Sequence, residues 1–158
     1  MKGTLSHELE VGLSADEIWV VYRSLELADL VVKLLPNIIQ KVELVEGDGG
    51  VGTVLHVYFP PGTPLVQSYK EKFTKIDDEK RVKEAHVVEG GYLQLGFLFY
   101  MVRFEVIAQS ETTSVVKSTI EYEIEEKFAT NSSLVSTYAL AIIHETVGKY
   151  LIEKKSNV

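Results

Sequence analysis

Six segments with the pattern of β-strands follow one another after Pro36, and no helical segment interrupts them. They are rich in β-branched and aromatic residues or alternate apolar with polar residues, and most are separated by turn-forming residues. The segments cover residues 38–45, 53–59, 66–76, 81–89, 97–108 and 114–125. Because short turns join only antiparallel neighbours, this order predicts an antiparallel sheet.

Two short helices are predicted before this strand region. Ser14 and Glu17 have the spacing of a capping box, which indicates a helix from about residue 15 to residue 22. A second helix is expected over residues 26–34, because the ring of Pro36 disfavours helical geometry in the preceding residue.

The two ends of the chain complete the predicted fold. The first eleven residues indicate a seventh strand, and the region from Val135 to the C-terminus repeats apolar residues at helical spacing. We therefore predict one α+β domain over residues 1–158, in which a seven-stranded antiparallel sheet grips a long C-terminal helix. A curved sheet around one helix also favours an internal cavity, although the same pattern is compatible with a filled core.

Composition excludes several classes of function. The net charge is −7 and no basic stripe is present, so we expect no nucleic-acid partner. The chain has no cysteine, which excludes disulfides and a thiol nucleophile and is compatible with the cytoplasm. No signal peptide and no membrane span are predicted, so we expect a cytoplasmic protein in which the glycosylation sequon at Asn131 is unused.

Two further patterns do not predict a cofactor. Gly47, Gly49 and Gly52 match G-x-G-x-x-G, but a strand follows them where a dinucleotide site needs a helix. We interpret this segment as a flexible loop with positive φ angles, or as a loop that borders a ligand site. The histidines lack metal-ligand spacing and are expected at the surface or its boundary; they are His7, His56, His86 and His144.

Glu71 is the first candidate for chemistry. In a strand, Tyr69, Glu71 and Phe73 share one face, whereas Lys70 and Lys72 share the other. Lysines are most easily placed in solvent, so Glu71 is predicted to point inward. Burial raises the pKa of a carboxyl group, which suits a general base near neutral pH.

Lys83 is the second candidate. It lies on the next predicted strand, beyond the turn at residues 77–79, and hairpin pairing brings it near Glu71 with an uncertainty of a residue or two. Two interpretations remain open at this point: a catalytic pair, or a cross-strand salt bridge at the surface.

Several segments resemble the norcoclaurine synthase branch of the plant pathogenesis-related class-ten family, which includes the birch-pollen allergen. They are residues 7–11, 14–19, 34–36, 47–53, 69–73 and 88–93. The resemblance implies the fold predicted above, with a cavity for small apolar or amphipathic molecules. It also implies a cofactor-independent enzyme that condenses dopamine with 4-hydroxyphenylacetaldehyde in a Pictet–Spengler reaction.

The resemblance assigns the catalytic residues as Tyr69, Glu71 and Lys83. Lys83 protonates oxygen as water leaves, Glu71 removes the ring proton, and Tyr69 orients the charged intermediate. One position departs from the pattern: Val102 stands where the enzyme has an acidic residue that helps to hold the amine. Arg103 is expected on the opposite strand face and cannot replace that residue.

The resemblance leaves three functions open. Norbelladine synthases, which join tyramine to 3,4-dihydroxybenzaldehyde, are similar at residues 1–11, 82–85 and 154–157 and carry an aliphatic residue at the Val102 position. Carriers of plant hormones are similar at residues 35–38 and 46–53 but lack the glutamate–lysine pair.

In each case we expect a small amphipathic aromatic ligand and a monomer or weak dimer. The predicted substrate-binding residues are Leu35, Ile39, Val57, Phe73, Leu95, Phe99, Met101, Val102 and Phe104.

Overall fold

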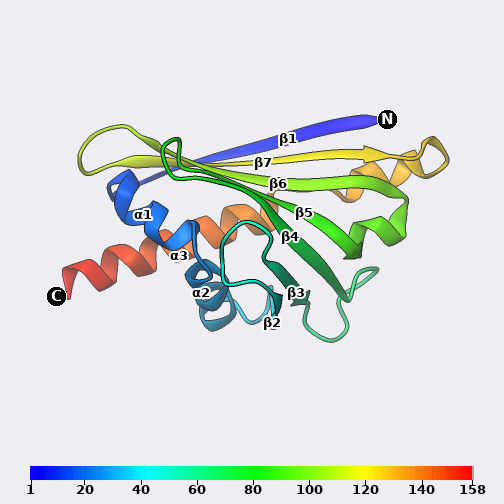
Figure 1. Cartoon of the computed structure of the whole chain (residues 1–158), viewed down its shortest axis with the longest axis horizontal. Helices are drawn as coiled ribbons and strands as arrows, with labels where there is room; N and C mark the ends of the chain where they lie inside the picture. The colour runs from blue at the N-terminus through cyan, green and yellow to red at the C-terminus, as the bar shows by residue number, and fades with distance from the viewer. Residues whose placement is uncertain (158) are drawn as a thin grey trace.

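A computed structural model describes residues 1–157 and shows seven strands and three α-helices (Figure 1). Two 3₁₀ helices, η1 and η2, join them. The elements are β1 Lys2–Val11, α1 Ala15–Tyr22, α2 Glu26–Leu34, β2 Lys41–Glu46, β3 Val54–Tyr58, β4 Ser68–Asp77, β5 Val82–Gly90, η1 Gly91–Leu95, β6 Phe97–Ala108, β7 Ser114–Ile124, η2 Glu126–Leu134 and α3 Tyr138–Ser156.

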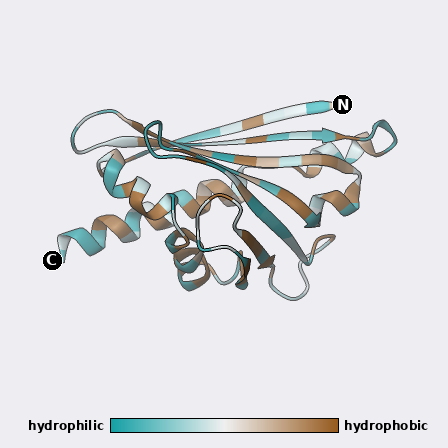
Figure 2. Ribbon diagram, viewed as in Figure 1, coloured by the Kyte–Doolittle hydropathy of each residue, from teal (hydrophilic) through white to brown (hydrophobic). Residues whose placement is uncertain are grey.

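The strands form one sheet in the order β1-β7-β6-β5-β4-β3-β2, and every neighbouring pair is antiparallel. Figure 1 shows α3 running beneath the sheet, with α1 and α2 beside it, so the sheet grips α3 as the sequence predicted. Apolar residues concentrate along β3, β6 and the N-terminal half of α3 (Figure 2). The predicted α+β fold and its element order are therefore confirmed.

The capping box of α1 is also confirmed. The Ser14 hydroxyl accepts a hydrogen bond from the Glu17 amide at 3.2 Å, and the Glu17 carboxylate accepts one from the Ser14 amide at 3.3 Å. Two donors at the start of the helix are thereby satisfied. This bonding anchors α1 against the core, where Ile18, Trp19 and Tyr22 are buried.

The structure corrects three details of the prediction. β2 begins at Lys41 and not at residue 38, because the amides of Ile38 and Ile39 bond back to the Leu35 carbonyl in a turn. Tyr138 is 73% exposed although it belongs to the apolar spacing that predicted the C-terminal helix, whereas Val147 of the same spacing is buried, together with Ile143, His144 and Gly148. His144 is fully buried and hydrogen-bonded, whereas we expected a surface or boundary histidine.

The glycine-rich segment is a loop between β2 and β3, with φ of +91° at Gly47, +105° at Gly49 and +96° at Gly52. Such angles favour glycine, which confirms the interpretation as a loop. A Cβ at Gly49 would lie 3.2 Å from the Leu25 side chain, so the loop lies close to the junction of α1 and α2.

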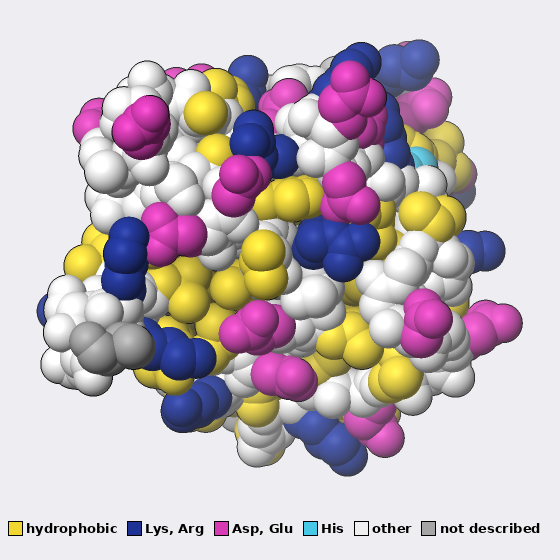
Figure 3. Space-filling model, turned by 60° about the vertical axis from the view of Figure 1, so that its left-hand side comes forward, with side chains coloured by type: hydrophobic (Ala, Val, Ile, Leu, Met, Phe, Trp, Pro, Cys, Tyr) yellow, Lys and Arg dark blue, Asp and Glu magenta, His cyan; other side chains and the backbone are white. Residues whose placement is uncertain are grey.

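The surface carries charges of both signs. Figure 3 shows lysine and arginine side chains interspersed with aspartate and glutamate on one face, with small apolar patches between them. Within residues 1–157, no helix combines the length and apolar character needed to cross a membrane.

Candidate active site

A cavity with two lobes lies between the sheet, α2 and α3. The lysine lobe has a volume of about 120 Å³ and contains Lys83, and the tyrosine lobe has a volume of about 130 Å³ and contains Tyr92 and Tyr100. The two lobes adjoin one another, because part of the wall belongs to both. These shared residues are Ile39, Tyr69, Glu71, Ala85, Val102, Leu140 and Ile143.

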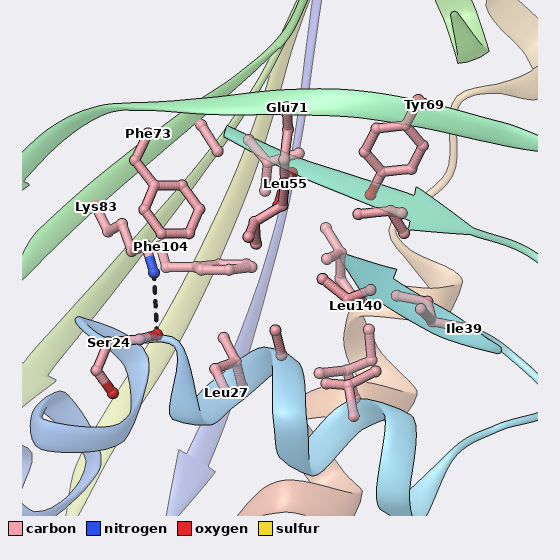
Figure 4. Close-up of a pocket in the computed structure, with 17 residues that line it drawn as sticks. Ser24, Leu27, Ile39, Leu55, Tyr69, Glu71, Phe73, Lys83, Phe104 and Leu140 are labelled. Carbon is pink, nitrogen blue, oxygen red and sulfur yellow. Dashed lines mark hydrogen bonds between the residues drawn. The ribbon is translucent and has the colours of Figure 1, made fainter. Parts of the chain in front are cut away.

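Glu71 and Tyr69 lie on β4 at the junction of the two lobes. Figure 4 shows both side chains pointing from β4 into the cavity, as the sequence predicted. Burial raises the pKa of the Glu71 carboxyl to about 7, and the positive charge of Lys83 limits this rise. A carboxyl group in this range can hold or release a proton near neutral pH, which is the property needed by a general base.

Lys83 extends from β5 into the lysine lobe and is only 5% exposed. Its Nζ donates to the Tyr22 carbonyl at 3.0 Å and to the Ser24 carbonyl at 3.4 Å, and it lies 3.9 Å from the centre of the Phe73 ring (Figure 4). Burial lowers the pKa of the Lys83 ammonium to about 8, and Glu71 opposes this shift. The amine can therefore exchange a proton close to physiological pH.

The strand register explains how the two groups share one cavity without forming an ion pair. Glu71 lies opposite Val87 and Lys83 opposite Ile76, and the inward pair Phe73 and Ala85 separates them. In the part of the chain that the structure describes, neither charge belongs to an ion pair of 4.0 Å or less. The alternative of a surface salt bridge is therefore wrong.

The tyrosine lobe adds phenol groups to the site. The rings of Tyr92 and Tyr100 stack at 4.0 Å with an angle of 4°, and Tyr69 packs against Phe59 at 5.7 Å. Burial raises the pKa of Tyr69 and Tyr100 well above the ordinary value, so both remain neutral hydroxyls. Neutral hydroxyls both donate and accept hydrogen bonds, which suits a hydroxylated aromatic ligand.

Val102 lies on β6 and lines both lobes. Among the cavity-lining residues that the structure describes, Glu71 and Lys83 are the only charged ones. Arg103 points to the opposite face, as expected, and pairs with Glu84 at 2.6 Å and Glu121 at 3.2 Å. The wall around Val102 is therefore apolar.

Five of the predicted substrate-binding residues line the cavity: Ile39, Val57, Phe73, Val102 and Phe104. Their contact with substrate stays a prediction.

Four predicted lining residues lie elsewhere. Phe99 and Met101 alternate with Tyr100 and Val102 along β6, so they point to the outer face, where the Phe99 ring packs against His86 at 5.0 Å. Leu95 belongs to η1 and packs beside Phe97 and Tyr100. Leu35 follows α2 and packs into the core between the helices.

Sequence reasoning missed other residues of the wall. Tyr100 has the same strand parity as Val102 and Phe104, and this signal could have found it. Leu140 and Ile143 belong to α3. Packing sets the rotation of this helix against the sheet, and no local sequence pattern predicts it. The other missed residues are Ser24, Leu27, Ala28, Val31, Ile38, Val42, Leu55, Phe59, Ala85, Val87, Tyr92, Ile120, Ser136 and Ala139.

A sheet that grips one long helix around a cavity defines the helix-grip fold. The chain belongs to the pathogenesis-related protein Bet v 1 family, whose model matches residues 1–154. Within the family it falls in the branch of norcoclaurine and norbelladine synthases. It is 53% identical to norbelladine synthase of Narcissus pseudonarcissus over 99% of this chain and 96% of that protein.

Two further relatives support this placement. S-norcoclaurine synthase 2 of Papaver somniferum is 41% identical over 100% of this chain and 69% of that protein. The structure of norcoclaurine synthase from Thalictrum flavum in complex with dopamine and hydroxybenzaldehyde superposes with a TM-score of 0.87, at 40% identity, over 97% of this chain and 88% of that one.

Proposed function

We propose that this protein is a condensing enzyme that joins an aromatic amine to an aromatic aldehyde as an imine, with tyramine and 3,4-dihydroxybenzaldehyde as the substrate pair. The observation that carries this proposal is the pair Glu71 and Lys83, the only charged side chains among the described residues of the cavity wall. Burial raises the pKa of Glu71 to about 7 and lowers the pKa of Lys83 to about 8. The identity of 53% to a norbelladine synthase supports the choice of substrates.

The geometry supports a sequence of proton transfers. The Glu71 carboxylate takes a proton from the substrate ammonium, which frees the nitrogen lone pair to attack the aldehyde carbon. The resulting carbinolamine loses its hydroxyl as water when the Lys83 ammonium protonates the oxygen. Loss of the N–H proton then leaves the neutral imine, and the surplus proton returns to solvent.

The two lobes offer one place for each substrate on either side of Glu71. The phenol groups of Tyr92 and Tyr100 match the ring hydroxyls of one partner, and the apolar wall of the lysine lobe matches an aromatic ring and its short chain. Tyr69 lies where the lobes join and can orient the nascent imine through its hydroxyl.

A second candidate is the Pictet–Spengler reaction of the norcoclaurine synthases. The presence of Tyr69, Glu71 and Lys83 and the TM-score of 0.87 to an enzyme with dopamine bound favour it. In that reaction a ring carbon attacks the iminium carbon, and Glu71 removes the ring proton to restore aromaticity. The apolar wall at Val102 favours the imine product over this alternative.

The test measures imine formation above the uncatalysed rate, by reductive trapping and mass spectrometry, with tyramine and 3,4-dihydroxybenzaldehyde. A parallel chiral assay uses dopamine and 4-hydroxyphenylacetaldehyde. We expect Lys83→Met and Glu71→Gln each to lower the catalysed rate by roughly 10²-fold, because each removes a proton-transfer group. Lys72→Met, on the exposed face of β4, is the matched control and should retain the rate.

The outcomes separate the candidates. Catalysis with the tyramine pair alone supports the proposal, whereas a single enantiomer from the dopamine pair alone supports the second candidate. Rates equal to background with both pairs, together with tight binding of a phenolic ligand, would reject an enzyme in favour of a carrier.

A further inference from the structure

Three buried polar side chains meet in the core outside the cavity wall. His144 on α3 lies with its Nδ1 at 2.7 Å from the Tyr22 hydroxyl on α1, and its Nε2 is hydrogen-bonded to the Ser118 hydroxyl on β7. Tyr22 is 1% exposed, and His144 and Ser118 are both fully buried. We call these residues the Tyr22–His144–Ser118 network.

The network accommodates a neutral imidazole. A neutral histidine offers one donor and one acceptor, and a hydroxyl at each nitrogen completes both. Burial lowers the pKa of His144 to about 3, and His7 on β1 contributes to the lowering. The network therefore keeps the same hydrogen bonds across the physiological pH range.

The backbone of the same tyrosine holds Lys83. Tyr22 is the last residue of α1, and its carbonyl accepts the 3.0 Å hydrogen bond from the Lys83 Nζ. Its hydroxyl is hydrogen-bonded to His144 on α3, and His144 in turn is hydrogen-bonded to Ser118 on β7. The Phe104 ring, which lines the lysine lobe, packs edge-on against Tyr22 at 5.7 Å and against His144 at 5.3 Å.

We propose that His144 is a positioning residue for Lys83: by fixing Tyr22, it holds the carbonyl oxygens at the end of α1 that orient the lysine ammonium toward the cavity. This inference rests on the proposed function for the importance of Lys83. It assigns the network a role beyond stability, because the network determines the environment of a group on the cavity wall.

The groups around Lys83 determine in which direction its pKa should shift when the network is broken. Lys83 faces Glu71 on β4, which favours its charged form, and Arg23 after α1, which disfavours it, but burial has the largest effect on its pKa. If the end of α1 loosens, water reaches the Nζ atom, takes the place of the two carbonyl hydrogen bonds and reduces the penalty of burial. The pKa of Lys83 should then rise toward its ordinary value.

The test titrates Lys83 by NMR in the full chain labelled with ¹³C at the lysine Cε, and Lys83→Met assigns the signal. Tyr22→Phe and Ser118→Ala each remove one oxygen atom from the network. Ser114→Ala is the matched control, because Ser114 lies on the same strand, is fully buried and bonds the Leu13 carbonyl at 2.9 Å.

We expect the pKa of Lys83 to rise by about half a unit or more in Tyr22→Phe and Ser118→Ala and to stay unchanged in Ser114→Ala. The pH–rate profile of condensation should shift by the same amount. An unchanged pKa in both network variants, or an equal shift in Ser114→Ala, overturns the inference. The titration needs no turnover, so a shifted pKa in a protein without condensing activity rejects the proposed function and leaves this inference standing.

Discussion

Val102 is the residue at which the resemblance to the norcoclaurine synthases predicts an acidic side chain, whereas this cavity has an apolar one. It lies opposite Ala85 on one side and Ile120 on the other, and all three line the tyrosine lobe. A substrate amine beside Val102 finds no second carboxylate, so the ammonium must rely on Glu71. Under the proposed function, the cavity therefore favours an amine that loses its proton on binding.

Val102→Asp tests this argument. A carboxylate at this position gives the ammonium a second partner, so we expect the rate with dopamine and 4-hydroxyphenylacetaldehyde to rise relative to the rate with the tyramine pair. The buried acid should also lower the free energy of unfolding by about 1–3 kcal/mol. Val102→Asn is the control, because asparagine has the shape of aspartate without its charge. If the ratio of the dopamine-pair rate to the tyramine-pair rate is equal in the two variants, charge at this position does not select the amine.

At the scale of elements, local rules explain most of what the sequence predicted. The capping box defined α1, Pro36 defined the end of α2, and strand alternation oriented Glu71 inward because Lys70 and Lys72 need solvent.

The misses have both local and long-range causes. Phe99 and Met101 were assigned to the cavity as apolar residues although their parity on β6 opposes that of Val102. Which residues of α3 line the cavity depends on how the helix is rotated about its own axis against the sheet. The position of the Lys83 ammonium depends on the backbone of another element, α1.

The capping box gives a prediction for α1 as a whole. Ser14→Ala removes the acceptor of the Glu17 amide, and we expect the free energy of unfolding to fall by about 1 kcal/mol in urea denaturation. Ser6→Ala on the exposed side of β1 is the control and should change it little. If both variants lose the same stability, the cap does not contribute beyond a surface serine.

For the whole molecule, the proposed catalytic groups cost stability. Glu71 has a folded pKa raised above its unfolded value, so its contribution to stability is fully present below about pH 4.5 and is lost as the pH rises to about 7. Lys83 has a lowered folded pKa, so its buried charge destabilises the fold at neutral pH. Between about pH 8 and pH 10.5 the folded chain releases this proton while the unfolded chain keeps it, and stability rises with pH.

Lys83→Met should therefore be more stable than the wild type although its catalysed rate is lower. At pH 7 we expect its free energy of unfolding to exceed that of the wild type by an amount on the order of 1–3 kcal/mol, because a buried charge is replaced by an apolar chain of similar length. At pH 10 the difference should shrink. Urea denaturation at both pH values measures this, with Lys72→Met as the control for the loss of any lysine.

A variant that is less stable than the wild type at pH 7 would mean that the carbonyls of Tyr22 and Ser24 stabilise the fold through Lys83. Lys83 would then be a structural cation that ties β5 to the end of α1. A gain in stability that accompanies a loss of rate is the result expected of a residue kept for chemistry, since the fold without it is the more stable one.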